Sequence, residues 1–119
     1  MSTSRLNSVM PSMPVADLDA AIKFYTEKLG FELAFVNGKF FAIVSRDGVE
    51  IGLTPADCHK GIPGKGSVYL KVSGVDALYA DILAKEIPAL HPLKVENYGM
   101  KEFMIADQDG NTVNYGEPC

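Results

Sequence analysis

The stretch VADLDA at residues 15–20 has a counterpart, VSGVDA, at residues 72–77, fifty-seven positions further along the chain. Each stretch leads into a segment whose apolar residues recur with a period close to 3.6, the spacing of an amphipathic helix. These apolar positions are Leu18, Ala21, Ile22, Tyr25 and Leu29 in the first segment, and Val75, Leu78, Tyr79, Ile82 and Leu83 in the second. The repeat predicts that one structural unit is used twice.

Turn signals also repeat downstream of both predicted helices. Asp47-Gly48 and Asp109-Gly110 each precede alternating apolar residues, and Asn37-Gly38 and Tyr98-Gly99 are further turn candidates. Such dipeptides favour hairpin turns, which need positive φ. Each half is therefore predicted to be a βαβββ module, with strands at 6–14, 31–37, 39–46 and 49–54, and then at 67–72, 92–97, 101–107 and 112–116. Chance similarity of two amphipathic helices is the alternative.

The predicted fold class is α+β, with two modules in one domain that spans residues 1–119. The modules cover about 6–54 and 67–117, and the Pro- and Gly-rich segment 55–66 is the linker. Strand alternation gives the sheet one apolar face, which should pack on the helices, and one mixed face. The modules are expected to form a curved mixed sheet with the helices on its convex side and a ligand cleft on its concave side. The alternative for the mixed face is a plain solvated surface.

The composition is that of an ordinary soluble domain, with 119 residues, 47% hydrophobic residues and a formal net charge of −4. The acidity argues against nucleic acid as a partner, and no apolar run is long enough to cross a membrane. No secretory signal is evident at the N-terminus. Cys58 and Cys119 are interpreted as free thiols, and a cytoplasmic location is expected.

Several segments resemble the glyoxalase/bleomycin-resistance (vicinal oxygen chelate) superfamily. PVADLDAAIKFY at 14–25 is similar to its first-helix signature, and DQDGN at 107–111 is similar to its Asp-Pro-x-Gly-Asn turn, with Gln108 where proline is usual. SGVDALYA at 73–80 and YGMKEF at 98–103 resemble the bleomycin-resistance branch, with Tyr in the place of Trp and Lys in the place of Arg. The resemblance covers nearly the whole chain.

The resemblance also locates the positions at which the superfamily's metalloenzymes hold a divalent ion with His or Glu. In this chain those positions are Met10, Gly52, Ser67 and Asn114. None of them is a normal ligand for zinc, nickel or iron. We therefore expect no metal and no other cofactor.

The function implied by the resemblance is a small-molecule binding protein that sequesters a cationic aromatic antibiotic of bleomycin type without covalent chemistry. Aromatic rings would stack on such a ligand, and an acidic cleft would attract its cationic end. The candidate ligand-binding residues are Ser12, Phe41 (with Phe40 as the alternative), Glu50, Ser67, Tyr69, Tyr98, Glu102, Phe103 and Asn114.

The resemblance further implies a homodimer in which Pro11 lets the first strand cross to the partner subunit. Two other functions stay open. One is a glyoxalase-like lyase or dioxygenase, metal-dependent or cofactor-free, in which Glu50 or Glu102 could act as a general base. The other is an accessory protein that escorts a metabolite in its producer.

Overall fold

The computed structural model describes residues 3–56 and 61–119 of the chain. In chain order its elements are β1 (Ser12–Val15), α1 (Leu18–Lys23), the π-helical segment η1 (Phe24–Lys28), β2 (Glu32–Asn37), β3 (Phe41–Arg46), β4 (Val49–Pro55), β5 (Ser67–Lys71), α2 (Val75–Ala84), β6 (His91–Val95), β7 (Met100–Ala106) and β8 (Thr112–Pro118). The described strands form two four-stranded sheets, with the orders β1-β4-β3-β2 and β5-β8-β7-β6. The predicted α+β class and the βαβββ repeat are confirmed.

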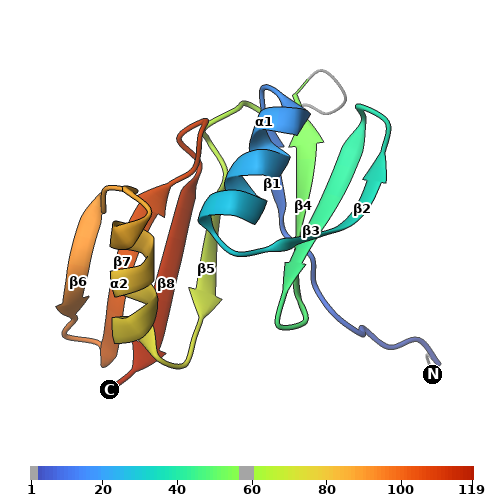
Figure 1. Cartoon of the computed structure of the whole chain (residues 1–119). Coiled ribbons are helices and arrows are strands. Elements are labelled where there is room, and N and C mark those ends of the chain that lie inside the picture. Colours follow the sequence, from blue (N-terminus) through green and yellow to red (C-terminus); the bar gives the residue numbers. More distant parts are fainter. Residues whose placement is uncertain (1–2, 57–60) are drawn as a thin grey trace.

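The two sheets have equivalent strand pairing, which reflects the repeat in the sequence. β1 runs parallel to β4, and β5 runs parallel to β8. Ser12 is in register with Gly52, and Tyr69, fifty-seven residues after Ser12, is in register with Asn114. The described chain forms two hydrogen-bonded sheets, which stand beside one another in Figure 1, where the sequence predicted one continuous sheet.

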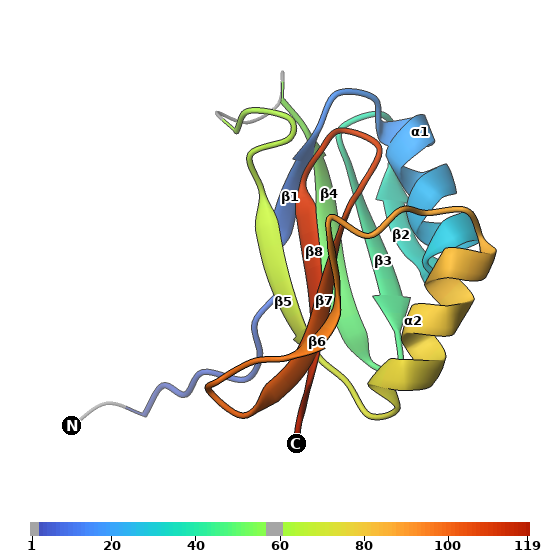
Figure 2. The ribbon, with the colours of Figure 1, turned by 90° about the vertical axis from the view of Figure 1, so that its left-hand side faces the viewer.

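Both helices cover the same side of the sheets (Figure 2). Asp17 caps α1, since its carboxylate accepts a hydrogen bond of 3.1 Å from the backbone N–H of Ala20. The apolar strand residues on this side are buried, among them Met13, Val15, Val44, Ile51, Leu53, Ile105 and Val113. None of the helices in the described part of the chain covers the opposite side, which we call the open face, so its side chains are available for binding.

The DQDGN turn at 107–111 joins the two modules. The Tyr25 hydroxyl donates a hydrogen bond of 2.8 Å to the buried carboxylate of Asp107, and burial together with Asp107 raises the pKa of this phenol. The Asn111 side chain donates to the carbonyl of Pro14 at 2.8 Å and accepts from the backbone N–H of Gly66 at 2.8 Å. The turn motif therefore has a structural role at this junction.

The first strand is much shorter than predicted. The prediction of a strand over 6–14 is wrong for its N-terminal part, because β1 begins at Ser12 and residues 3–10 are exposed. The carbonyl of Pro11 still accepts from the N–H of Gly52 at 2.8 Å, but proline has no N–H with which to continue the ladder. The preceding residues form an arm that extends away from the sheets (Figure 1).

Two further predictions concern the cysteines and membrane-spanning helices. Cys119 is free and exposed, whereas Cys58 lies outside the described residues. Within the described ranges, no helix has the length and apolar character needed to span a membrane.

Candidate functional site

Two tyrosines and a glutamate gather on the open face of the C-terminal sheet. Tyr69 comes from β5, Glu102 from β7, and Tyr98 from the turn between β6 and β7. The Tyr69 hydroxyl donates to Glu102 Oε1 at 3.1 Å. The side chains of Tyr69 and Tyr98 remain 42% and 60% exposed. The structure thus brings together three of the predicted ligand-binding residues.

The carboxylate of Glu102 contributes to a raised pKa of both phenols. A hydrogen bond to Glu102, with smaller contributions from desolvation and nearby charges, raises the pKa of Tyr98 to about 12. The pKa of Tyr69 is also raised, first by desolvation and then by its hydrogen bond to Glu102. Both tyrosines are therefore neutral hydrogen-bond donors around one carboxylate at physiological pH.

Gly116 makes the position of Tyr69 possible. Gly116 lies on β8, in register with Glu102 of β7. A Cβ atom at residue 116 would overlap the Tyr69 hydroxyl. The phenol can therefore lie close over the strand and reach Glu102 only because this residue has no side chain.

A cavity of about 470 Å³ adjoins this cluster. Its lining includes Tyr98, Glu102 and Asn114, together with charged or titratable groups that the sequence analysis did not select, namely His91, Lys94 and Glu96. His91 and Lys94 were missed because β6 shows a register shift between them, which hides the period-two pattern of an ordinary strand.

Phe103 does not fit the predicted role of an open-face binding residue. It follows Glu102 on β7, so its side chain points to the opposite side of the sheet. Its ring is 1% exposed and lies 4.9 Å from the Tyr79 ring and 5.0 Å from the Tyr115 ring, measured between centroids. Phe103 is one of the residues that line the cavity, but its ring belongs to the core beneath α2.

The predicted residues of the N-terminal module lie on the open face of the other sheet. The Phe41 ring packs over Gly52, where a Cβ would lie 3.1 Å from the ring. Ser12 Oγ and Thr54 Oγ1 are 2.6 Å apart and hydrogen bonded, and Glu50 is exposed. Phe40 is exposed in the turn before β3. This group contains no counterpart of the carboxylate with two phenols.

The four positions implied for a metal carry groups that do not fit a first-row divalent ion. Met10 offers a thioether beside Gly52, which has no side chain at all. The Ser67 hydroxyl accepts from Thr112 at 2.8 Å, and the Asn114 amide donates to the carbonyl of Val68 at 3.0 Å. Zinc, nickel and iron sites need imidazole, thiolate or carboxylate ligands. Over residues 3–56 and 61–119, no three His, Cys, Asp or Glu side chains are close enough to share an ion. His59 lies outside these ranges.

Known proteins resemble this chain over nearly its whole length. It is 30% identical over 125 residues to a bleomycin resistance protein from Geobacillus stearothermophilus, with 89% of this chain and 92% of that protein covered. The crystal structure of TnmS3, an antibiotic binding protein from Streptomyces sp. CB03234, matches with a TM-score of 0.80 at 27% identity and covers 100% of this chain and 99% of its own.

The fold is also that of the bleomycin-binding protein from Streptomyces verticillus, solved with copper(II)-bleomycin. That match has a TM-score of 0.80 at 23% identity, over 95% of this chain and 97% of that one. The model of the Glyoxalase/Bleomycin resistance protein/Dioxygenase superfamily matches residues 5–115. With the repeated βαβββ fold and this match, the chain belongs to the glyoxalase/bleomycin resistance protein/dioxygenase superfamily.

Proposed function

We propose that this protein binds a cationic aromatic antibiotic of bleomycin type on its open face and withholds it from its target without covalent chemistry. The observation that carries the proposal is the carboxylate of Glu102 between the exposed rings of Tyr69 and Tyr98. The antibiotic-binding and bleomycin-resistance relatives support a role of this kind.

The cluster suits a ligand with both a flat ring and a positive charge. Exposed tyrosine rings can stack on a heteroaromatic group, with about 0.5–1.5 kcal/mol for each pair beyond area burial. A cation over such a ring gains about 0.5–2 kcal/mol more, depending on how far it is desolvated. Glu102 can accept a further hydrogen bond from a cationic ligand, and Glu96 offsets the positive charge of Lys94 in the same cavity wall.

A homodimer is part of the proposal. The arm of residues 3–10 is exposed, and Leu6 and Val9 have almost no contact with their own chain. Exposed apolar side chains on an extended arm favour a partner surface, and two-fold exchange of the arm beyond Pro11 would provide one. Light scattering after gel filtration should give a dimer for the full chain and a monomer for a chain that lacks residues 1–10. A monomeric full chain at micromolar concentration would contradict this part of the proposal.

A thermal-shift and calorimetry experiment with metal-free bleomycin and copper(II)-bleomycin tests the binding function. A ligand at about 100 times its Kd should stabilise the protein by roughly 2.7 kcal/mol. Tyr98→Ala should weaken binding by about 1–3 kcal/mol if its ring stacks on the ligand, and Glu102→Gln should weaken it by a similar amount. The matched controls are Leu83→Ala, an exposed apolar side chain on α2, and Glu27→Gln, an exposed carboxylate on η1.

Mass spectrometry after incubation separates sequestration from catalysis. The bound compound should be recovered unchanged, whereas a modified product would support the lyase or dioxygenase alternative. If neither form of bleomycin binds, or if the Tyr98 and Glu102 variants bind as tightly as the controls, the proposal is wrong.

A further inference from the structure

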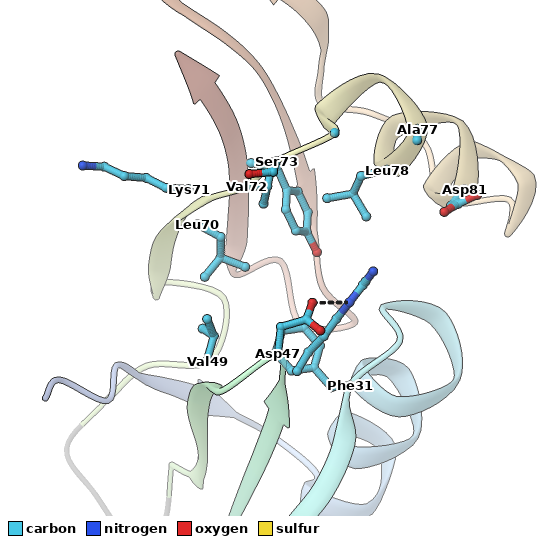
Figure 3. A pocket seen from close by; sticks show the side chains of 13 residues that line it. Phe31, Asp47, Val49, Leu70, Lys71, Val72, Ser73, Ala77, Leu78 and Asp81 are labelled. Atoms are coloured by element: carbon cyan, nitrogen blue, oxygen red, sulfur yellow. Dashed lines mark ion pairs between the residues drawn. The ribbon is translucent and has the colours of Figure 1, made fainter.

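A second cavity, of about 520 Å³, lies between the two modules and away from the site described above (Figure 3). The N-terminal module contributes Phe31 and the β3–β4 turn, and the C-terminal module contributes β5, the start of α2 and β8. Much of its wall is apolar, from Phe31, Val49, Leu70, Val72, Ala77 and Leu78. The cavity is therefore suited to the apolar body of a small molecule.

Tyr115 lines this cavity with an unsatisfied hydroxyl. The residue is 3% exposed, its ring stacks on Phe103, and its hydroxyl has no hydrogen-bond partner among the described residues. A buried hydroxyl without a partner is costly, and native proteins rarely keep one without a reason. Burial raises the pKa of Tyr115 to about 12, although the nearby Arg46 guanidinium acts in the opposite direction. The hydroxyl is therefore a neutral donor that lies near a cation.

Arg46 also lines this cavity and is a second hydrogen-bond donor there. Its Nη1 donates to the carbonyl of Leu29 at 3.0 Å, and its Nε lies 3.7 Å from a carboxylate oxygen of Asp47. The Asp47 carboxylate is largely exposed, so this long ion pair is weak. A guanidinium has five N–H donors, and these two contacts leave others for a ligand.

We propose that this cavity binds a second small molecule, an amphipathic monocarboxylate. Its carboxylate accepts hydrogen bonds from the Arg46 guanidinium and the Tyr115 hydroxyl, and its apolar body lies against Phe31, Leu70 and Leu78. The ligand replaces Asp47 as the partner of Arg46, whose side chain is 40% exposed.

The surrounding charges favour a single negative charge on the ligand. Asp47 and Asp81 line the cavity together with Arg46 and Lys71, so the charges of the wall nearly cancel. A phosphate dianion would meet two carboxylates, whereas a monocarboxylate can displace one of them from Arg46. The planar fork of a guanidinium also matches the geometry of a carboxylate.

The test uses the full chain with 4-phenylbutyrate and its uncharged amide as probes, measured by isothermal titration calorimetry. The carboxylate should bind at least about tenfold more tightly than the amide, since a charge-assisted hydrogen bond is lost in the amide. Tyr115→Phe keeps the ring and removes only the hydroxyl, and should weaken carboxylate binding roughly fivefold to tenfold. Arg46→Met should weaken it further, and Asp47→Asn should strengthen it, because the competing carboxylate is gone.

Two controls separate this site from the open face and from nonspecific charge. Tyr98→Ala, on the open face, and Lys39→Met, an exposed cation in the β2–β3 turn, should leave binding of the probes unchanged. Equal affinity for the acid and the amide, no binding of either probe, or unaltered binding by the Tyr115 and Arg46 variants would each overturn the proposal. Bleomycin binding does not enter this test, so the two proposals can fail independently.

Discussion

Tyr25 and Tyr115 are both buried on the helix side of the sheets, but their hydroxyls differ in their partners. The Tyr25 hydroxyl donates to Asp107 at 2.8 Å, whereas that of Tyr115 has no partner among the described residues. The substitution of Tyr by Phe therefore removes a hydrogen-bonded hydroxyl at residue 25 and a hydroxyl without a described partner at residue 115. Because both rings stay in place, neither change opens a large cavity, and the two variants isolate the hydroxyls.

Tyr25→Phe is expected to destabilise the fold by about 1.5–3 kcal/mol, the range for a hydrogen bond to a charged group. Asp107 keeps three other donors, the backbone N–H groups of Asp109 and Asn111 on Oδ1 at 2.9 and 3.0 Å and the Asn111 side-chain amide on Oδ2 at 2.9 Å, but none of them fills the place of the phenol on Oδ2. Tyr115→Phe in the ligand-free protein is expected to be neutral or to stabilise by up to about 1 kcal/mol, because a desolvated hydroxyl is removed.

The assay is equilibrium unfolding in urea, followed by circular dichroism, with the two variants and the parent protein measured side by side. The difference between the variants should be about 1.5–4 kcal/mol, or roughly 6–16 °C in Tm for a chain of this size. Equal m-values would show that the denatured states are comparable. A loss of more than about 1 kcal/mol in Tyr115→Phe would mean that this hydroxyl has a partner, such as water. A Tyr25→Phe variant as stable as the parent would refute the importance of the Tyr25–Asp107 bond.

Three further predictions follow from the junction and the open face. Asn111→Ala should cost about 2–4 kcal/mol of unfolding free energy in urea, because its buried amide bonds to Pro14 in the N-terminal module, to Gly66 in the linker and to Asp107 in the C-terminal module; a loss below 1 kcal/mol would contradict this. Gly116→Ala should displace Tyr69 and lower the affinity for the open-face ligand in calorimetry, and unchanged affinity would exclude Tyr69 from the site. The pKa values of Tyr98 and Tyr115 are raised to about 12 in the folded protein, compared with about 10 in an unfolded chain. The contribution of these two groups to the free energy of unfolding is therefore fully present below pH 10 and is lost as the pH rises through 12. Urea midpoints at pH 9 and pH 11 test this, and a flat profile would argue against it.

Local signals in the sequence were sufficient to predict the modules. The Asp-Gly turns and the helical periods depend on nearby residues, and Asp47 and Gly48 indeed have positive φ, at 53° and 81°. The length of β1 was not predictable in this way: β1 begins at Ser12, in register with Gly52, although β4 continues to Val49. The error on Phe103 was avoidable, because alternation along β7 places its side chain on the face opposite to that of Glu102.

The second cavity could not be predicted from sequence patterns, because its lining residues come from both modules. Arg46 ends β3 and Tyr115 lies on β8, so their proximity depends on how the two modules pack. On the sequence alone, Tyr115 reads as an ordinary core residue of an alternating strand. Only the structure shows that its hydroxyl has no partner within residues 3–56 and 61–119 and that a cation lies nearby.

The repeat also explains why the proposed binding cluster occurs in one module and not in the other. The equivalent registers place Ser12 opposite Gly52 and Tyr69 opposite Asn114. Two residues further along these strands, Thr54 of β4 corresponds to Gly116 of β8. In the N-terminal sheet, Ser12 and Thr54 bond to each other at 2.6 Å and satisfy their own hydroxyls. In the C-terminal sheet, a large ring replaces the serine and a glycine replaces the threonine, so the phenol extends over the strand to Glu102. The two modules thus differ at two equivalent positions: the Ser12–Thr54 hydrogen bond of the N-terminal sheet is replaced by an exposed Tyr69 ring beside Glu102 in the C-terminal sheet. This difference is why we place the ligand on the C-terminal sheet.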